Sequence, residues 1–543
     1  MMGNPNQPIF ILSKDTERIK GRPAMSANIS AAKAVSEAVR TTLGPLGMDK
    51  MLVQGSTQEI LITNDGATIL REIEIEHPCA KLIVEVSKTQ EHECYDGTTS
   101  AVVLTGAILK QSEDLLDKDI HPTVLCKGFR KAEKLVKEEL ESIGWRVDGE
   151  DLFNVAGTAL TGKSAEDSSD ILGKICVDAL DAVAVDGEVN LDHIKVLSFE
   201  GGMVEESNLV NGVVLEKEKL HSEMIGEMID ASILLMTTPL DVKDTKFDAQ
   251  LQLTDPNQLK GFLEQEEDAL KDMAAAIAVH GVSAVFCQKE IDDLCAHYLN
   301  KLGITAYKRV KQSDMDALAR VTGARFVSKV EEIGSDDLGV AHVSPVQYGE
   351  HNCTLIKSED AKSQTVILRG ATGHSAAEVE RAFDDALGVC SIAYTEPVIA
   401  GGGSIYAHLA RHLREHTVKG SDRESMAIEA YASALESIPR TLAENAGLDP
   451  VDALFDLRKA TSPTHGISTE GEIIDMVEAN VIEPRKVVTN AIGCATESAI
   501  MVLRIDDVIA SKGAPTGMPD MGNLSMANAS GLVPSGSGQL VAM

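Results

Sequence analysis

The sequence predicts a multidomain, α-rich protein in which two mainly helical ends flank an α/β middle. The chain has 543 residues, which corresponds to roughly three or four domains. Apolar residues make up 43% and charged residues 25%, as in globular proteins, but aromatic residues make up only 3%. The cores are therefore expected to be aliphatic. Helical periodicity at both ends and strand-like runs between them complete the prediction.

The first quarter of the chain is predicted to form helices around one hairpin. Apolar residues recur at helical spacing from Ala24 to Leu43, and Gly44-Pro45 ends that helix. Two short runs, Met51 to Val53 and Glu59 to Thr63, are typical of paired strands. Further helices are expected at Pro78 to His92, Thr98 to Asp117 and about Thr123 to Ile143.

The middle of the chain, from about residue 200 to 365, alternates strand-like runs with helical segments. The runs are Ile233 to Thr238, Ala284 to Gln288, Thr305 to Lys308 and Thr365 to Leu368. Helices dominate again from Ser375 to Asp507, and the two helical ends form one discontinuous domain if both contribute to the same site. The tail from Ser511 to Met543 is rich in Gly, Met, Ser and Pro without periodicity, so we expect it to be flexible.

Composition excludes several classes of protein. The net charge of −34 argues against non-specific nucleic-acid binding, which requires a basic surface. Nine cysteines at irregular spacing, without a Cys-x-x-Cys pair, indicate buried thiols in a reducing compartment. No signal peptide is visible, and the best apolar stretch, Met273 to Phe286, falls short of the ~18 residues that a membrane span requires. We therefore expect a cytoplasmic protein with no membrane and no nucleic-acid partner.

Two copies of an Asp-Gly-x-Thr cassette, Asp65 to Thr68 and Asp96 to Thr99, lie 31 residues apart. Carboxylates suit Mg²⁺, which is usually held by one or two of them together with substrate phosphates. Glycine lets the backbone approach a ligand, and threonine hydroxyls and loop N–H groups can bind phosphate oxygens. The second copy precedes a predicted helix, whose N-terminus favours an anion. Because Asp-Gly is also an ordinary turn signal, either copy can equally be a simple turn.

One motif matches a phosphate-binding P-loop letter for letter. Residues Gly157 to Ser164 read G-x-x-x-x-G-K-S. A P-loop follows a buried strand and opens a helix, whereas the preceding Leu152 to Ala156 is short and polar at its centre. We expect that no working P-loop forms here, although Lys163 can still meet a phosphate in another geometry.

Three further motifs each have a functional and a structural interpretation. The run Gly401 to Ser404 permits close approach to a nucleotide or serves as a hinge. Asp385, next to Asp384, is a catalytic carboxylate or, more often for adjacent acids on a helix, part of a solvated face. His408, His412 and His416 share one helix face and could ligate a metal, but surface histidines are the better interpretation because no carboxylate or cysteine has the matching offset.

The segment from Thr245 to Ile277 is unusual because an extended polar stretch leads into an amphipathic helix. Thr254-Asp255-Pro256 is a helix-starting signal. The helix carries an apolar stripe of Leu259, Phe262, Leu263, Leu270, Met273 and Ile277. It either packs on its own domain or protrudes and binds another molecule through this stripe.

These motifs, in this order, make the chain resemble a subunit of the group II chaperonins, the archaeal and eukaryotic-cytosolic class that includes the thermosome, with the archaeal branch favoured. The resemblance covers about residues 12 to 510. It is carried by Thr42 to Leu52, Thr63 to Glu72, Asp96 to Val103, Thr161 to Lys163, Gly401 to Ser404, Pro439 to Leu448 and Arg504 to Ala510.

The resemblance implies an ATP-dependent chaperone that encloses non-native client proteins in a double ring with a built-in lid. It implies an equatorial ATPase domain from residues 1–147 and 404–543, with 511–543 as a tail. An intermediate hinge domain would comprise 148–216 and 368–403. An apical client-binding domain would comprise 217–367, with a helical lid protrusion at about 244–277. Its partners would be other chaperonin subunits in a homo- or hetero-oligomer, expected in eight-membered rings.

The resemblance also implies roles for individual residues, with ATP and Mg²⁺ as the cofactors. Asp96 would bind the metal, and Asp65 and Asp385 would be the catalytic carboxylates that act on the attacking water. The nucleotide would be bound by Gly44, Pro45, Gly97, Thr98, Thr99, Ser100, Lys163, Gly402 and Glu483. Because Asp385 would belong to a different domain from Asp65 and Asp96, hydrolysis would require the hinge to close.

One residue departs from the family pattern. The family usually has glycine immediately before the position of Asp96, and this chain has Tyr95. A bulky residue there narrows the conformations open to the loop. A ring scaffold that binds ATP with impaired hydrolysis therefore stays open as an alternative to an active chaperone. The motif from Gly157 to Ser164 keeps a second alternative open, a P-loop NTPase.

Overall fold

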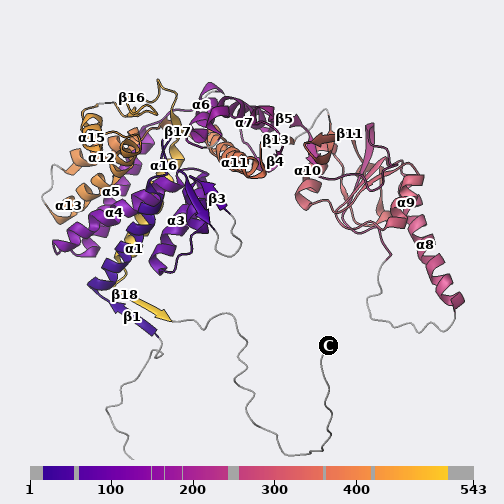
Figure 1. The fold of residues 1–543 in the computed structure, drawn as a ribbon, viewed down its shortest axis with the longest axis horizontal. Coiled ribbons are helices and arrows are strands. Elements are labelled where there is room, and N and C mark those ends of the chain that lie inside the picture. The colour runs from indigo at the N-terminus through magenta and orange to yellow at the C-terminus, as the bar shows by residue number, and fades with distance from the viewer. Residues whose placement is uncertain are drawn as a thin grey trace, which may run out of the picture. The chain divides into compact units, whose positions relative to one another are not determined.

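The computed structural model describes residues 16–53, 60–147, 149–163, 165–185, 187–242, 256–358, 363–417, 422–460 and 462–511. The chain divides into a small unit of its two ends, Met1–Met25 with Ile505–Met543, and a large unit, Ser26–Arg504. In the small unit, strand β1 (Thr16–Lys20) pairs antiparallel with β18 (Asp507–Ser511) (Figure 1). The predicted tail lies outside the described residues, apart from Ser511.

The N-terminal elements follow the sequence prediction closely. They are α1 (Arg22–Arg40), β2 (Lys50–Val53), β3 (Ile60–Thr63), α2 (Gly66–Glu72), α3 (Pro78–Cys94), α4 (Thr98–Asp117) and α5 (Pro122–Ser142). Strands β2 and β3 pair antiparallel, which confirms the hairpin, whereas residues 54–59 between them lie outside the described part. The structure confirms the predicted helix from Thr98 to Asp117 with the same two ends. Its N-terminal end is fixed by Gly97, which adopts a left-handed conformation there.

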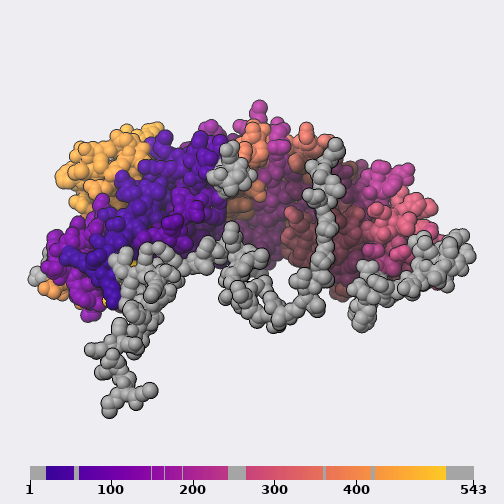
Figure 2. All heavy atoms as spheres, turned by 60° about the horizontal axis from the view of Figure 1, so that its bottom comes forward, coloured from indigo at the N-terminus to yellow at the C-terminus, as the bar shows by residue number. Residues whose placement is uncertain are grey.

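The C-terminal elements are again mainly helical. They are β14 (Val398–Ala400), α12 (Ser404–Thr417), α13 (Arg423–Leu435), α14 (Ser437–Asn445), α15 (Pro450–Lys459), β15 (His465–Ile467), β16 (Ile473–Asp475), β17 (Ile482–Pro484) and α16 (Arg485–Leu503). Helix α16 contacts α3, α4 and α5, and α13 contacts α4 and α5. Helices from the two ends of the sequence therefore pack side by side, as the indigo and yellow surfaces in Figure 2 show.

Helix α16 is the one described helix that is long and apolar enough to cross a membrane, with a mean hydropathy of 1.2. Since 61% of its apolar window is buried inside the protein against other helices, its composition is that of a core helix. The most membrane-like segment of the described chain is thus α16 and not the stretch from Met273 to Phe286.

The segments that link the ends to the middle form a smaller α/β layer. Helices α6 (Gly149–Leu160), α7 (Ser169–Val183) and α11 (Gly373–Thr395) pack with a three-stranded sheet of β4 (Ile194–Glu200), β13 (Gln364–Gly370) and β5 (Asn208–Asn211). Central strand β13 is parallel to β4 and antiparallel to β5. Five short 3₁₀ helices are also described: Glu166–Ser168, Leu191–His193, Val204–Glu206, Val330–Glu332 and Ser335–Asp337.

The middle of the chain forms a seven-stranded mixed sheet. Its order is β6 (Val213–Leu215), β12 (His351–Lys357), β11 (Gly339–Tyr348), β7 (Met228–Met236), β8 (Ala284–Cys287) and β9 (Thr305–Tyr307), and β10 (Phe326–Val327) also pairs with β7. Its helices are α8 (Pro256–Val279), α9 (Asp293–Lys301) and α10 (Gln312–Thr322). Strands β7, β8 and β9 are parallel, which confirms the α/β pattern read from these runs.

Both faces of the sheet are buried at the parallel strands β8 and β9, which explains why these two strands are continuous apolar runs. Along β8, Val285 and Cys287 belong to the core with α8 and α9, whereas Ala284 and Phe286 belong to the core with α10. In the amphipathic α8, Leu270 and Ile277 are buried against its own sheet and α9, so the packed interpretation holds for this half of the stripe. Residues 244–255 of the expected protrusion lie outside the described part, and so do the side chains of the other half of the stripe, Leu259, Phe262 and Leu263.

Candidate nucleotide site

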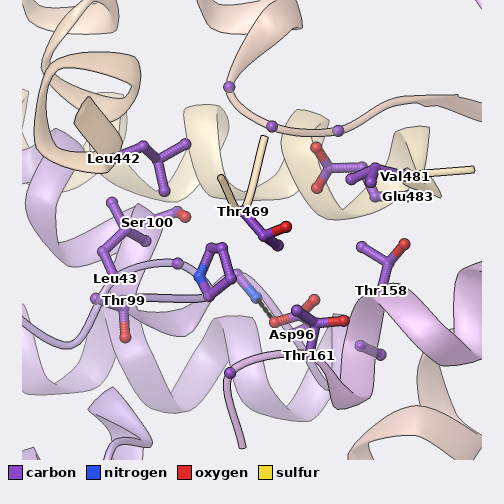
Figure 3. Close-up of a pocket in the computed structure, with 18 of the residues that line it drawn as sticks. Leu43, Asp96, Thr99, Ser100, Thr158, Thr161, Leu442, Thr469, Val481 and Glu483 are labelled. Carbon is purple, nitrogen blue, oxygen red and sulfur yellow. Dashed lines mark hydrogen bonds between the residues drawn. The ribbon is translucent and has the colours of Figure 1, made fainter. Parts of the chain in front are cut away.

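A cavity of about 400 Å³ lies in the large unit and collects residues from nine separate stretches of the chain. All twelve residues that sequence analysis proposes for the site line it: Gly44, Pro45, Asp65, Asp96, Gly97, Thr98, Thr99, Ser100, Lys163, Asp385, Gly402 and Glu483. Figure 3 shows Asp96, Thr99 and Ser100 at the start of α4, with Thr469 and Glu483 from the C-terminal part of the chain on the same cavity.

The first cassette starts helix α2 with its own carboxylate. Asp65 follows β3 and is the N-cap residue, with Oδ2 accepting from the N–H of Thr68 at 2.7 Å and Oδ1 from the N–H of Ala67 at 3.2 Å. The hydroxyl of Thr98 lies 3.4 Å from Asp65 Oδ1 and thereby connects the two cassettes. Asp65 is therefore both a helix cap and one of the carboxylates on the cavity wall.

The second cassette leaves its helix start uncapped by any side chain. Gly97 is the N-cap of α4 with φ 74°, and no side chain accepts from the first turn. The carboxylate of Asp96 turns back to accept from the N–H of Gly97 at 2.6 Å, while Gln90 Nε2 donates to the carbonyl of Asp96 at 2.8 Å. The N–H groups and the dipole of a 20-residue helix thus face the cavity beside a carboxylate, which is a ready anion site.

Close backbone contacts shape the floor of the cavity. A Cβ at Gly162 would lie 2.9 Å from the Cα of Pro45, and one at Gly44, which has φ 84°, would lie 2.3 Å from a methyl carbon of Leu442. The side-chain amide of Asn64 donates to the carbonyl of Gly162. Glycine is favoured at both positions because both have a left-handed φ, and a side chain at Gly162 would also press on the backbone of Pro45.

An ion pair joins helix α11 to the loop after α6. Lys163 Nζ lies 2.6 Å from Asp385 Oδ2, and their side chains are only 18% and 28% exposed. Burial raises the pKa of the Asp385 carboxyl to about 6; Lys163 opposes this shift, and the charges of Asp65 and Asp96 add to it. The interpretation of Asp384-Asp385 as a solvated face is correct for exposed Asp384 and wrong for Asp385, because α11 turns this residue into the cavity.

The opposite part of the cavity wall is built by the β14–β17 pair. Glu483 of β17 is opposite Ile399 of β14. Burial, with a smaller contribution from the charge of Asp96, raises the pKa of Glu483 to about 8. Gly402 follows β14 with φ 62°, and its carbonyl accepts from the N–H of Ile467 at 3.0 Å. This side of the cavity is therefore largely uncharged near neutral pH.

The profile of the TCP-1/cpn60 chaperonin family matches residues 35–513. The chain belongs to this chaperonin family. The chaperonin is 46% identical over 533 residues to the thermosome subunit beta of Methanothermobacter thermautotrophicus, covering 96% of this chain and 99% of that protein. It is 47% identical over 519 residues to the alpha subunit of the same organism, covering 94% of this chain and 96% of that protein.

A third archaeal relative points the same way. The chaperonin is 47% identical over 526 residues to the thermosome subunit of Methanopyrus kandleri, covering 94% of this chain and 96% of that protein. The protein is therefore a group II chaperonin of the archaeal kind, as the resemblance predicts. It is an ATP-dependent chaperonin and an ATPase.

The P-loop interpretation is wrong for this chaperonin. Gly157 lies inside α6, which runs from Gly149 to Leu160, so a helix occupies the place of the strand that a P-loop follows. Lys163 still reaches the cavity from the turn after this helix. The same helix carries Asn154 and Thr158 into the cavity wall, at the spacing of one helix turn.

Sequence analysis did not propose several residues that line the cavity of the chaperonin. They include Asn64, Asn154, Thr158, Tyr406, Thr469 and Asn480. Asn64 directly precedes Asp65, and Thr158 lies in the P-loop-like run, so both stood beside motifs already considered. Tyr406 is on α12, two residues after the run Gly401 to Ser404, so it also stood beside a motif already considered. Thr469 and Asn480 carry no comparable local signal, because only the folding of the C-terminal part of the chain brings them to the cavity.

The surface interpretation of the histidine run is correct for exposed His416 and wrong for His408 and His412. His408 Nε2 lies 2.8 Å from Glu139 Oε1, and His412 Nδ1 lies 3.4 Å from Glu139 Oε2, with both histidine side chains largely buried. Glu139 comes from α5, so these contacts tie α12 to α5. Within the described residues, no group of three or more His, Cys, Asp or Glu side chains could hold a metal ion.

Proposed function

We propose that the chaperonin closes a double-ring cavity around non-native proteins, and that the hydrolysis of Mg-ATP in the cavity described above drives the closure. The observation that carries the proposal is the convergence of the twelve proposed residues on one cavity. Their chemistry divides in two, with carboxylates, lysine and a helix N-terminus on one side and an uncharged wall on the other. Such a division suits a nucleotide, whose phosphates are charged and whose base is not.

The phosphate side is assigned to the start of α4 and the loop of Gly44 and Pro45. Backbone N–H groups of Thr98, Thr99 and Ser100 would bind phosphate oxygens. A single carboxylate, that of Asp96, fits Mg²⁺ at this place, since the ion commonly takes one or two carboxylates plus phosphate and water. When bound, the ion would neutralise charge on the phosphates.

The water side is assigned to Asp65 and Asp385. Two carboxylates near the phosphate end can orient a water and accept its proton. Lys163, paired with Asp385, would exchange that partner for the terminal phosphate when ATP binds. Gly402 and Glu483 are assigned to the nucleoside, where a protonated Glu483 can donate a hydrogen bond.

The domain assignment is proposed as the sequence resemblance implies. The helical elements of 1–147 and 404–543 would be equatorial, 148–216 and 368–403 intermediate, and 217–367 apical with a lid at about 244–277. The separate hydrophobic cores of the small α/β layer and of the seven-stranded sheet support three bodies. Because Asp385 is on α11 of the intermediate part, ATP turnover would depend on the position of that part.

The partners are proposed to be other chaperonin subunits in eight-membered double rings and non-native clients in the cytoplasm. The net charge of −34 supports a protein that stays soluble and does not bind nucleic acid.

The direct test is steady-state phosphate release by the assembled full-length protein with Mg-ATP, with and without EDTA. Electron microscopy with and without ATP gives the second measurement, because closure should appear only with nucleotide. Metal-dependent release together with closure supports the proposal. A protein that binds ATP and assembles but releases no phosphate would instead be the ring scaffold with impaired hydrolysis.

A further inference from the structure

The residue that departs from the family pattern has an unusual backbone conformation. Tyr95 ends α3 with φ 60° and ψ −8°, in the left-handed region, where its N–H donates to the carbonyl of Glu91 at 2.9 Å. An aromatic residue rarely adopts this conformation, and such an outlier is often held in place by surrounding contacts at a functional site. Tyr95 directly precedes Asp96, so its conformation sets the direction in which the chain enters the second cassette.

The ring of Tyr95 lies directly on a glycine of α11. A Cβ at Gly388 would lie 2.1 Å from Cγ of Tyr95 and 2.5 Å from each of its two Cδ atoms. No side chain fits in that space, so Gly388 is required as long as Tyr95 is present. Glycine inside a helix is otherwise unfavourable by about 1 kcal/mol relative to alanine, and its presence here is explained by the ring.

The contact lies in the middle of one stripe of α11. Asp385, Gly388 and Ile392 are spaced by three and four residues and therefore share one helix face. Asp385 pairs with Lys163, Gly388 receives the ring of Tyr95, and Ile392 is buried against Cys94 and Val487. The end of α3 and the start of the second cassette thus dock along this face, one helix turn from the catalytic carboxylate.

We propose that Tyr95 is a positioning residue for ATP hydrolysis. Its ring, seated on Gly388, fixes how closely α11 approaches the Asp96 loop and so where Asp385 lies relative to the phosphate. The proposal rests on the proposed role of Asp385. In this proposal Tyr95 supports ATP hydrolysis and does not impair it, because the ring stabilises the docked arrangement in which Asp385 and Asp96 line one cavity.

The test is a double-substitution cycle of Tyr95→Gly and Gly388→Ala, with kcat and KM for Mg-ATP measured on the assembled protein. With Tyr95 present, Gly388→Ala should lower kcat roughly tenfold because the new methyl group displaces the ring and α11. KM should stay within about twofold, because the phosphate loop and the nucleoside wall are unchanged. In the Tyr95→Gly background the same substitution should change kcat by less than about twofold, since nothing then occupies the space.

Tyr95→Phe supplies the conservative variant, since it keeps the ring and should keep most of the kcat that Tyr95→Gly loses. If Gly388→Ala prevents assembly, restoration of assembly by Tyr95→Gly in the double variant tests the same contact. Equal effects of Gly388→Ala in both backgrounds, or a Tyr95→Phe variant as slow as Tyr95→Gly, would overturn the proposal alone. An Asp385→Ala variant with unchanged turnover would overturn the proposed function and this proposal together.

Discussion

The two Asp-Gly-x-Thr cassettes have the same letters and opposite structures. In the first, the carboxylate of Asp65 occupies the N-terminus of α2 and accepts two of its backbone N–H groups. In the second, the N-cap is Gly97, no side chain accepts a hydrogen bond from the first turn of α4, and the carboxylate of Asp96 accepts from the N–H of Gly97 instead. One helix start is therefore filled by the protein itself, and the other is available to a ligand.

The difference arises from the backbone conformation at and beside the aspartate of each cassette. Asp65 leaves strand β3 in an extended conformation, with φ −67° and ψ 119°, which is usual for an N-cap. Tyr95 and Gly97 are both left-handed, so the chain reverses sharply around Asp96. A four-residue motif thus specifies the residue types of a site, while the backbone that enters it decides which group faces the ligand.

Among the substitutions at the two cassettes and their partners, Asp96→Ala should lower ATP hydrolysis most. We expect Mg-dependent phosphate release to fall roughly 10²- to 10³-fold, because the cassette open to the ligand loses its only carboxylate. Helix α4 should remain formed, since Asp96 does not cap it. Asp114→Ala, at an exposed position of the same helix, is the matched control, and a rate within threefold of wild type for Asp96→Ala would contradict the assignment.

Asp385→Ala tests the carboxylate of α11 that lines the same cavity as Asp65 and Asp96. We expect kcat to fall about 100-fold while ATP binding, measured by calorimetry, persists, because the residue acts on water and not on the nucleotide. Asp384→Ala, the exposed neighbour, should retain near-normal turnover. Unchanged turnover in Asp385→Ala would remove this residue from the mechanism.

Two substitutions of Asp65 distinguish its role as a helix cap from its proposed catalytic role. Asp65→Ala removes the cap and should destabilise α2 by about 1 kcal/mol, whereas Asp65→Asn keeps an oxygen that can accept from the same N–H groups. Hydrogen exchange at Ala67 and Thr68 should therefore accelerate several-fold in the alanine variant and little in the asparagine variant. Both variants should lose turnover if the charge acts on water; normal turnover in Asp65→Asn would show that capping is its whole role.

Glu483 gives the smallest expected effect and probes the uncharged wall. Its pKa is raised to about 8, so it is mainly protonated at pH 7 and becomes charged as the pH rises through 8. A buried negative charge there would weaken nucleotide binding, and KM for ATP should rise several-fold between pH 7 and 9. Glu483→Gln mimics the protonated form, so its KM should stay flat; a matching rise in that variant would exclude Glu483 as the titrating group.

Local sequence determined a large part of the structure. Periodicity and capping signals located α4 from Thr98 to Asp117 and the parallel strands around Ala284 and Thr305, because these elements depend on interactions a few residues apart. The residue types of the phosphate side were also apparent, since carboxylate, glycine and hydroxyl groups lie within four residues of one another. The family resemblance extended this to distant residues such as Lys163 and Glu483.

Only the tertiary structure decided which of these groups meet and how. The sequence does not distinguish the two adjacent aspartates on α11. The packing of that helix exposes Asp384 and turns Asp385 toward Lys163. The first half of the P-loop match, Gly157 to Leu160, forms the end of helix α6, whose apolar face packs against α7 and α11. The fit of the Tyr95 ring on Gly388 joins positions 293 residues apart, and no local pattern contains it, since its cause is the close approach of two helices.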